Sequence, residues 1–209
     1  MKVKICGILD AETALYAIEQ GADALGFVFA QSKRRICPDT AKNIIELLPK
    51  HIQKVGVFVN EPKKNIEKIA HYSGLTHLQL HGDETPVFCR SFSYPVIKAF
   101  NIGSDEDLLK IKDYECESYL LDSPRTKSRG GTGMTFDWTI LSSGKIESGK
   151  IILAGGLDSE NVGMAINLVN PYMVDVSSGV ETDGIKDHDK IRKFIQIAKQ
   201  SGGSKYANI

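Results

Sequence analysis

Short, mostly apolar runs alternate with amphipathic stretches from one end of the chain to the other. The runs are rich in β-branched residues, and several are apolar almost throughout, as is typical of strands buried on both faces. Between them the apolar spacing lengthens toward the helical period, as it does at Ile66, Ile69 and Ala70. This pattern predicts eight strands with helices between them, at residues 3–6, 25–29, 55–59, 78–81, 96–100, 119–122, 151–154 and 173–176.

Residues that favour helix starts follow several of these strands. Asp10 and Thr85 are of the types that cap a helix N-terminus, and Pro38, Pro62 and Pro86 stand where a first-turn proline is tolerated. Strand starts recur every roughly 20 to 30 residues, which is the length that a βαβ unit needs. The sheet is therefore expected to be parallel, with the helices outside it.

Eight βα units can close into a barrel, so the predicted fold class is α/β, a single-domain (β/α)8 TIM barrel. An open doubly wound sheet is the alternative. It usually carries GxGxxG after its first strand, whereas this chain has Cys6-Gly7-Ile8-Leu9-Asp10. At 209 residues the chain has room for one large core. We expect a barrel over residues 1–200 and a flexible tail over residues 201–209.

The charge balance excludes some partners. Lys plus Arg and Asp plus Glu number 26 each, so no net field attracts nucleic acid or an anionic membrane. The chain opens on a strand-like segment and not on the long apolar stretch of a signal peptide or membrane span, which predicts a cytoplasmic protein. No metal is expected either, because CxxC spacing and paired histidines are missing around the cysteines, which are Cys6, Cys37, Cys89 and Cys116.

In a barrel of parallel strands the chemistry lies where strands end and βα loops begin. Polar residues close three of the predicted strands: Cys6, His81 and Asp122. Two glycine-rich turns follow the last two strands and can cradle a phosphate with backbone N–H groups, namely Gly155-Gly156 and Ser177-Ser178-Gly179. A third glycine cluster lies in the longest loop and is expected to cover the ligand, namely Gly130-Gly131-Thr132-Gly133.

A series of motifs resembles the phosphoribosylanthranilate isomerases, in register and in order from residue 2 to about residue 198. The matching stretches include Lys4-Ile5-Cys6-Gly7, Gly26-Phe27-Val28-Phe29, Ser32-Lys33-Arg34, Val55-Gly56-Val57-Phe58-Val59, Gln79-Leu80-His81-Gly82, Gly130-Gly131-Thr132-Gly133, Phe136-Asp137-Trp138, Ala154-Gly155-Gly156-Leu157 and Asp175-Val176-Ser177-Ser178-Gly179-Val180-Glu181.

The resemblance implies an Amadori rearrangement of N-(5′-phosphoribosyl)anthranilate to 1-(o-carboxyphenylamino)-1-deoxyribulose 5-phosphate, a step of tryptophan biosynthesis that needs no cofactor. It makes Cys6 the general base, Asp122 the general acid and Arg34 the partner of the anthranilate carboxylate. His81 and Asp175 are expected to contact the substrate as well.

The two catalytic roles require opposite shifts in the pKa values of Cys6 and Asp122. A thiol acts as a base only when it is ionised, so Cys6 is expected to have a low pKa, and Lys4 lies two residues back on the same side of the strand. Asp122 is expected to have a high pKa, because an acid must hold its proton near neutral pH.

Each candidate has a structural alternative. Cys6 could be a small buried hydrophobe, and Asp122 could merely start a turn. Asp175 alternates with two valines, so it could face the barrel interior as a rival acid. His81 could be a packed or capping histidine rather than part of a substrate pocket. Two of the charges in the run Ser32-Lys33-Arg34-Arg35 are expected to be solvated.

Other functions fit the chain less well. The isomerase of histidine biosynthesis performs the same chemistry, but it has an aspartate where Cys6 stands and a half-barrel repeat that is not found here. An indole-glycerol-phosphate synthase needs a longer N-terminal extension with a catalytic lysine and glutamate. A non-catalytic sugar-phosphate-binding barrel would not need both Cys6 and Asp122.

One segment departs from the family pattern. After Glu181 the family usually carries a proline before its glycine, whereas this chain has Thr182-Asp183-Gly184, which puts the rigidity of that loop in doubt. The sequence leaves open whether the barrel is a monomer or a homodimer, because the outer helices of either carry apolar edges.

Overall fold

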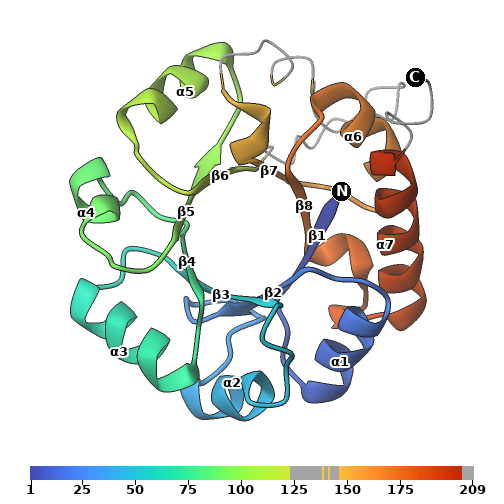
Figure 1. The fold of residues 1–209 in the computed structure, drawn as a ribbon, viewed down its shortest axis with the longest axis horizontal. Helices are drawn as coiled ribbons and strands as arrows, with labels where there is room; N and C mark the ends of the chain where they lie inside the picture. Colours follow the sequence, from blue (N-terminus) through green and yellow to red (C-terminus); the bar gives the residue numbers. More distant parts are fainter. Residues whose placement is uncertain (123–137, 139–140, 142–145, 204–209) are drawn as a thin grey trace.

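The chain folds as a closed ring of eight parallel strands surrounded by helices, in a computed structural model that describes residues 1–122, 138, 141 and 146–203. Figure 1 looks down the ring, with the helices outside it. The strand order follows the sequence, and β1 closes the ring by pairing with both β2 and β8. The predicted single-domain (β/α)8 barrel is confirmed.

The eight barrel strands match the predicted apolar runs to within one or two residues. Their bounds are β1 Lys2–Cys6, β2 Ala24–Val28, β3 Gln53–Phe58, β4 His77–Leu80, β5 Val96–Asn101, β6 Ser118–Asp122, β7 Ile151–Ala154 and β8 Met173–Val176. Every pair in the ring is parallel, as the spacing of strand starts predicted.

The helices begin where the cap residues predicted. Asp10 accepts a hydrogen bond from the Thr13 amide, Thr85 accepts one from the Phe88 amide, and Pro38 and Pro86 are first residues of their helices. The bounds are α1 Ala11–Glu19, α2 Pro38–Ile45, α3 Lys63–Ser73, α4 Pro86–Arg90, α5 Asp105–Lys110, α6 Val162–Val169 and α7 His188–Gly203, with short 3₁₀ turns at Ile111–Asp113, Ser148–Lys150 and Ser178–Val180.

Side chains that alternate along each strand divide between two environments. One set packs against the helices and forms the large core. The other set points into the ring, where the middle is filled by apolar side chains: Ala24, Val55, Ile97, Ala99, Leu120, Ile152, Ala154 and Met173. This apolar plug separates the polar inward residues at the carboxyl ends of the strands from those at the amino ends, and the functional site lies at the carboxyl ends.

A small hairpin follows the last barrel strand and was not predicted. Strand β9 Glu181–Thr182 pairs antiparallel with β10 Ile185–Lys186. The two residues between them, Asp183 and Gly184, both have positive φ, as a type I′ hairpin turn requires. The Asp-Gly turn therefore orders the segment in which the family's proline is missing.

The end of the chain differs from the prediction of a tail that starts at residue 201. Helix α7 continues through Gly203, and a Cβ at Gly202 would lie 2.4 Å from that of Met1, so the two ends of the barrel chain pack together. Residues 204–209 lie outside the described part. None of the helices in residues 1–122 and 146–203 combines the length and apolar character that a membrane span requires.

Candidate active site

A pocket opens at the carboxyl ends of the barrel strands. Ten predicted site residues line it: Cys6, Arg34, His81, Asp122, Gly155, Gly156, Asp175, Ser177, Ser178 and Gly179. The predicted cover of the ligand, Gly130-Gly131-Thr132-Gly133, lies outside the described residues. Strand ends that are up to 170 residues apart in the chain thus meet at one rim, as a parallel barrel demands.

Cys6 ends β1 and is buried beside the ammonium of Lys4. A Cβ at Gly26 on the neighbouring strand would lie 2.7 Å from the Cys6 sulfur and 3.1 Å from the Lys4 nitrogen, so only glycine leaves room for both groups. Burial raises the pKa of the Cys6 thiol, and the nearby charges of Lys4 and Lys186 oppose that rise only in part.

The prediction of a low pKa for Cys6 is therefore wrong. Lys4 lies beside the thiol as expected, but it is shared with Asp175, whose charge raises the pKa of the thiol. Lys4 itself is completely buried, and the neighbouring Asp175 and Cys6 hold its pKa above the ordinary value although burial alone would lower it.

Asp175 faces the barrel interior, as the alternation of β8 suggested. Its Oδ1 lies 2.8 Å from the Lys4 Nζ, and both side chains are nearly inaccessible to solvent. Asp175 is therefore engaged by a fully buried ammonium, whose pKa is raised. This arrangement favours Asp122 over Asp175 as the acid.

Asp122 ends β6 and faces His81, which follows β4. The His81 Nε2 lies 3.6 Å from the Asp122 Oδ2. On its other side the His81 Nδ1 lies 3.0 Å from the amide nitrogen of Gln79, a residue of β4 that also lines the pocket. His81 is therefore a pocket residue with two polar neighbours and not a histidine packed in the core.

Arg34 reaches the pocket from the loop after β2, and its stem passes over Gly7, where a Cβ would lie 2.5 Å from the Arg34 Cδ. Its Nε and Nη2 donate to the two oxygens of Glu181 at 2.6 and 2.5 Å. Lys186 donates to the same carboxylate at 2.6 Å and to the Ser177 carbonyl at 3.0 Å. The β9–β10 hairpin thus holds the guanidinium from one side.

The charges around Glu181 explain its ionisation. Burial by itself would raise the pKa of Glu181, but the hydrogen bonds from Arg34 and Lys186 hold it below the ordinary range. Burial lowers the pKa of Lys186 in spite of its carboxylate partner.

The neighbours of Arg34 in its loop, Lys33 and Arg35, are both exposed, so the expectation of two solvated charges is confirmed.

The glycine turns after β7 and β8 pack against each other. Gly155 and Gly156 both have positive φ, and a Cβ at Gly179 would lie 1.9 Å from the carbonyl oxygen of Leu157. The Ser177 hydroxyl donates to the Cys6 carbonyl at 3.1 Å, which ties the second turn to β1. Main-chain groups, rather than long side chains, therefore form this wall of the pocket.

Replacing Gly179 with alanine is expected to raise KM by about tenfold, because the methyl group would separate the two turns and disturb the wall that they form. Steady-state kinetics would measure the change. Gly149→Ala is the matched control, since a Cβ there meets nothing within 4 Å. An unchanged KM for Gly179→Ala would show that the contact between the turns has no part in binding.

Comparison with known protein families agrees with the geometry of the pocket. The model of the N-(5′-phosphoribosyl)anthranilate isomerase family matches residues 3–197. The chain belongs to this family. Among curated members, the isomerase of Bacillus mycoides is 54% identical over 201 residues, a match that covers 96% of this chain and 98% of the relative. The isomerase of Bacillus cereus strain B4264 is also 54% identical with the same coverage.

Solved isomerase structures share the fold over nearly the whole chain. The phosphoribosylanthranilate isomerase of Thermotoga maritima superposes with a TM-score of 0.86 at 43% identity, covering 96% of this chain and 99% of that one. A further isomerase structure, determined in complex with reduced 1-(o-carboxyphenylamino)-1-deoxyribulose 5-phosphate, has a TM-score of 0.84 at 41% identity and the same coverage.

Several residues around the isomerase pocket were not predicted as site residues. Glu181 was noted only as the end of a motif and Lys186 was assigned no role, although the Asp-Gly turn between them is a strong hairpin signal. Gln79 was noted only within a motif, although it alternates with His81 and therefore points to the same face of β4. Among the residues that the structure describes, no three His, Cys, Asp or Glu side chains gather as they would around a metal ion.

Proposed function

We propose that this isomerase acts on N-(5′-phosphoribosyl)anthranilate by general acid–base catalysis, with Asp122 as the acid and Cys6 as the base. The observation that supports these roles is that both groups line one pocket at the barrel rim, on strands separated only by β7 and β8. The other carboxylate of the pocket, Asp175, is already paired with Lys4.

The reaction requires two proton transfers. Asp122 gives a proton to the ribose ring oxygen, and the bond between that oxygen and C1′ breaks to leave an iminium and a carboxylate. The Cys6 thiolate then removes the proton from C2′, and the electrons of the C–H bond neutralise the iminium to form an enolamine. Tautomerisation of the enolamine yields the ketone product. The Lys4 ammonium beside Cys6 stabilises the thiolate.

The two ends of the substrate are held by different walls in this proposal. The phosphate lies against the turns at Gly155-Gly156 and Ser177-Ser178-Gly179. The anthranilate carboxylate meets Arg34, whose guanidinium is already oriented by Glu181. Because Nε and Nη2 of Arg34 face Glu181, the substrate carboxylate is received by the other edge of the guanidinium.

Replacing Arg34 with alanine is expected to raise KM by about 10- to 100-fold while kcat stays within a few fold, because a clamp contributes equally to the bound substrate and the transition state. Lys33→Ala is the control from the same loop, because that side chain is exposed. A collapse of kcat with an unchanged KM would assign Arg34 to the chemistry instead of to binding.

The proposed activity is tested on purified protein with freshly generated phosphoribosylanthranilate, whose anthranilate fluorescence should disappear without added cofactor. The gene should also restore growth to a tryptophan auxotroph that lacks this step. An assay with the aminoaldose substrate of histidine biosynthesis, run side by side, would reveal a second activity. Failure to consume phosphoribosylanthranilate would overturn the proposal.

Oligomeric state and location remain predictions. One Thermotoga maritima isomerase is described as dimeric, and its engineered monomers superpose on this chain with a TM-score of 0.85. We propose that this chain also pairs with a second copy, which sedimentation equilibrium would test, and that it acts in the cytoplasm, as expected for a step of amino-acid biosynthesis.

A further inference from the structure

Gln79 is an amide buried inside the polar end of the barrel. It is only 1% exposed, and it points into the pocket from β4 between Val57 and Ile97 of the neighbouring strands. Its amide nitrogen lies 3.0 Å from the Nδ1 of His81. Its carbonyl oxygen has no hydrogen-bond partner among the described residues. A buried amide with one contact in a pocket calls for an explanation, because leaving such an oxygen unpaired is costly.

The orientation of this amide determines the tautomer of His81. When the Gln79 NH₂ group donates to Nδ1, the imidazole proton must lie on Nε2. In the donating orientation the carbonyl oxygen and one N–H have no hydrogen-bond partner among the described residues, whereas the reversed amide would leave both N–H groups unpaired, and an unpaired N–H is tolerated less well than an unpaired carbonyl. The donating orientation is therefore favoured, and it points the Nε2 proton of His81 toward the Asp122 Oδ2 at 3.6 Å.

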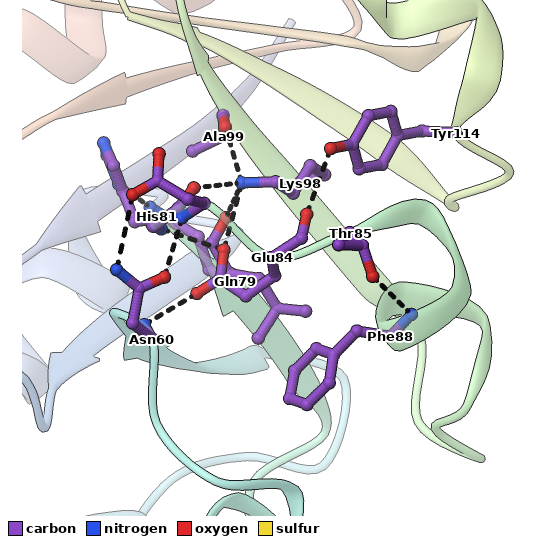
Figure 2. Close-up of polar contacts among 12 residues, drawn as sticks. Asn60, Gln79, His81, Glu84, Thr85, Phe88, Lys98, Ala99 and Tyr114 are labelled. Atoms are coloured by element: carbon purple, nitrogen blue, oxygen red, sulfur yellow. Dashed lines mark hydrogen bonds and ion pairs between the residues drawn. The ribbon is translucent and has the colours of Figure 1, made fainter.

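The backbone around His81 is fixed by a buried ion pair. Lys98 of β5 lies 3.1 Å from Glu84, and both side chains are at most 3% exposed. The Lys98 ammonium also donates to the carbonyls of Leu80 and Gly82, which flank His81. Figure 2 shows the Lys98 ammonium with its contacts to Glu84 and Ala99. Glu84 in turn accepts from the Gly82 amide at 2.9 Å. The chain on both sides of His81 is thus tied to β5, which fixes the backbone position from which the ring faces Asp122.

We propose that Gln79 is a positioning residue that holds His81 in the tautomer with its proton on Nε2, so that His81 donates a hydrogen bond to Asp122. The inference rests on the role proposed for Asp122. When Asp122 releases its proton to the ring oxygen it becomes a carboxylate, and the Nε2–H contact strengthens as that charge develops. The 3.6 Å separation closes when the substrate binds, as catalytic contacts commonly do.

Nitrogen-15 NMR of histidine-labelled protein reads the tautomer directly, without any activity. With five histidines in the chain, the His81 signals are assigned by comparison with His81→Gln. The wild-type protein should show the proton of His81 on Nε2, and Gln79→Met should produce a mixture of tautomers. A wild-type proton on Nδ1, or the same pattern in both proteins, would overturn the proposal.

Measurements of kcat and KM distinguish a positioning role of Gln79 from a role in packing alone. Gln79→Met keeps the volume and removes the amide, so kcat should fall about tenfold with little change in KM, the effect of losing one oriented hydrogen bond. His81→Gln supplies an N–H donor without tautomers, and its kcat is the reference for the double variant. In the His81→Gln background, Gln79→Met should then have little further effect. Gln53→Met, at the opposite end of the barrel, is the matched control.

The two hypotheses fail in different ways. If Asp122→Asn keeps full activity, the proposed acid is wrong whatever His81 does. If Asp122→Asn is inactive but Gln79→Met lowers kcat equally in the wild-type and His81→Gln backgrounds, Gln79 acts through packing, and only the positioning role is wrong.

Discussion

Replacing Cys6 with alanine is expected to lower kcat by about 10³-fold, with KM nearly unchanged, because a general base contributes roughly 10² to 10⁴ to the rate and no other thiol reaches the pocket in the described part of the chain. The small side chain leaves Lys4 and Asp175 paired with each other, so the fold should be preserved. Steady-state kinetics and a thermal unfolding curve would measure both effects.

The pH dependence of kcat/KM provides a second test of the Cys6→Ala variant. Because burial raises the pKa of Cys6, the thiolate is a minor form near neutrality, and its fraction grows as the pH increases. The kcat/KM of the wild-type enzyme should therefore climb with pH through the neutral range, and Cys6→Ala should lose that climb. The exposed thiol supplies a control: Cys37→Ser keeps a capping side chain on α2 and should leave the profile unchanged. A wild-type rate that is flat across this range would contradict a buried thiol as the base.

Asp122→Asn is expected to lower kcat by about 10³-fold as well, since an amide has the shape of the carboxyl group but no proton to give to the ring oxygen. The side chain should still face His81, so KM and stability should change little. Steady-state kinetics at several pH values would show whether the loss persists where the wild-type enzyme is most active.

Asp83→Asn provides the matched control for this variant. Asp83 is exposed in the loop after β4, beside His81 and Gly82, and it contacts Asn60 rather than the centre of the pocket. Its replacement removes a carboxylate from the same rim without removing the proposed acid. If Asp83→Asn impaired kcat as strongly as Asp122→Asn, a general electrostatic effect would replace the assignment of an acid.

The amino-acid sequence by itself determined the fold and ten of the residues that line the pocket. Eight apolar runs with helices between them specify parallel βα units, because such strands bury both faces, and the absence of GxGxxG after the first strand favoured a closed barrel over an open sheet. Once the barrel is known, residues that end strands share one rim, and this is why Cys6, His81 and Asp122 could be placed together before any contact was known. Motifs then ranked these candidates above Asp175.

Only the tertiary structure decided which charges neutralise one another. Lys4 pairs with Asp175 and Arg34 with Glu181, across 171 and 147 positions of the chain. Local sequence periodicity does not reveal such ion pairs, because they depend on how distant strand ends are aligned around the ring. The error about Cys6 has the same origin: its pKa is set by burial and by the neighbours that share Lys4. Sequence therefore identified the reactive groups, whereas their protonation states and partners follow from distances and solvent exclusion that exist only in the folded barrel.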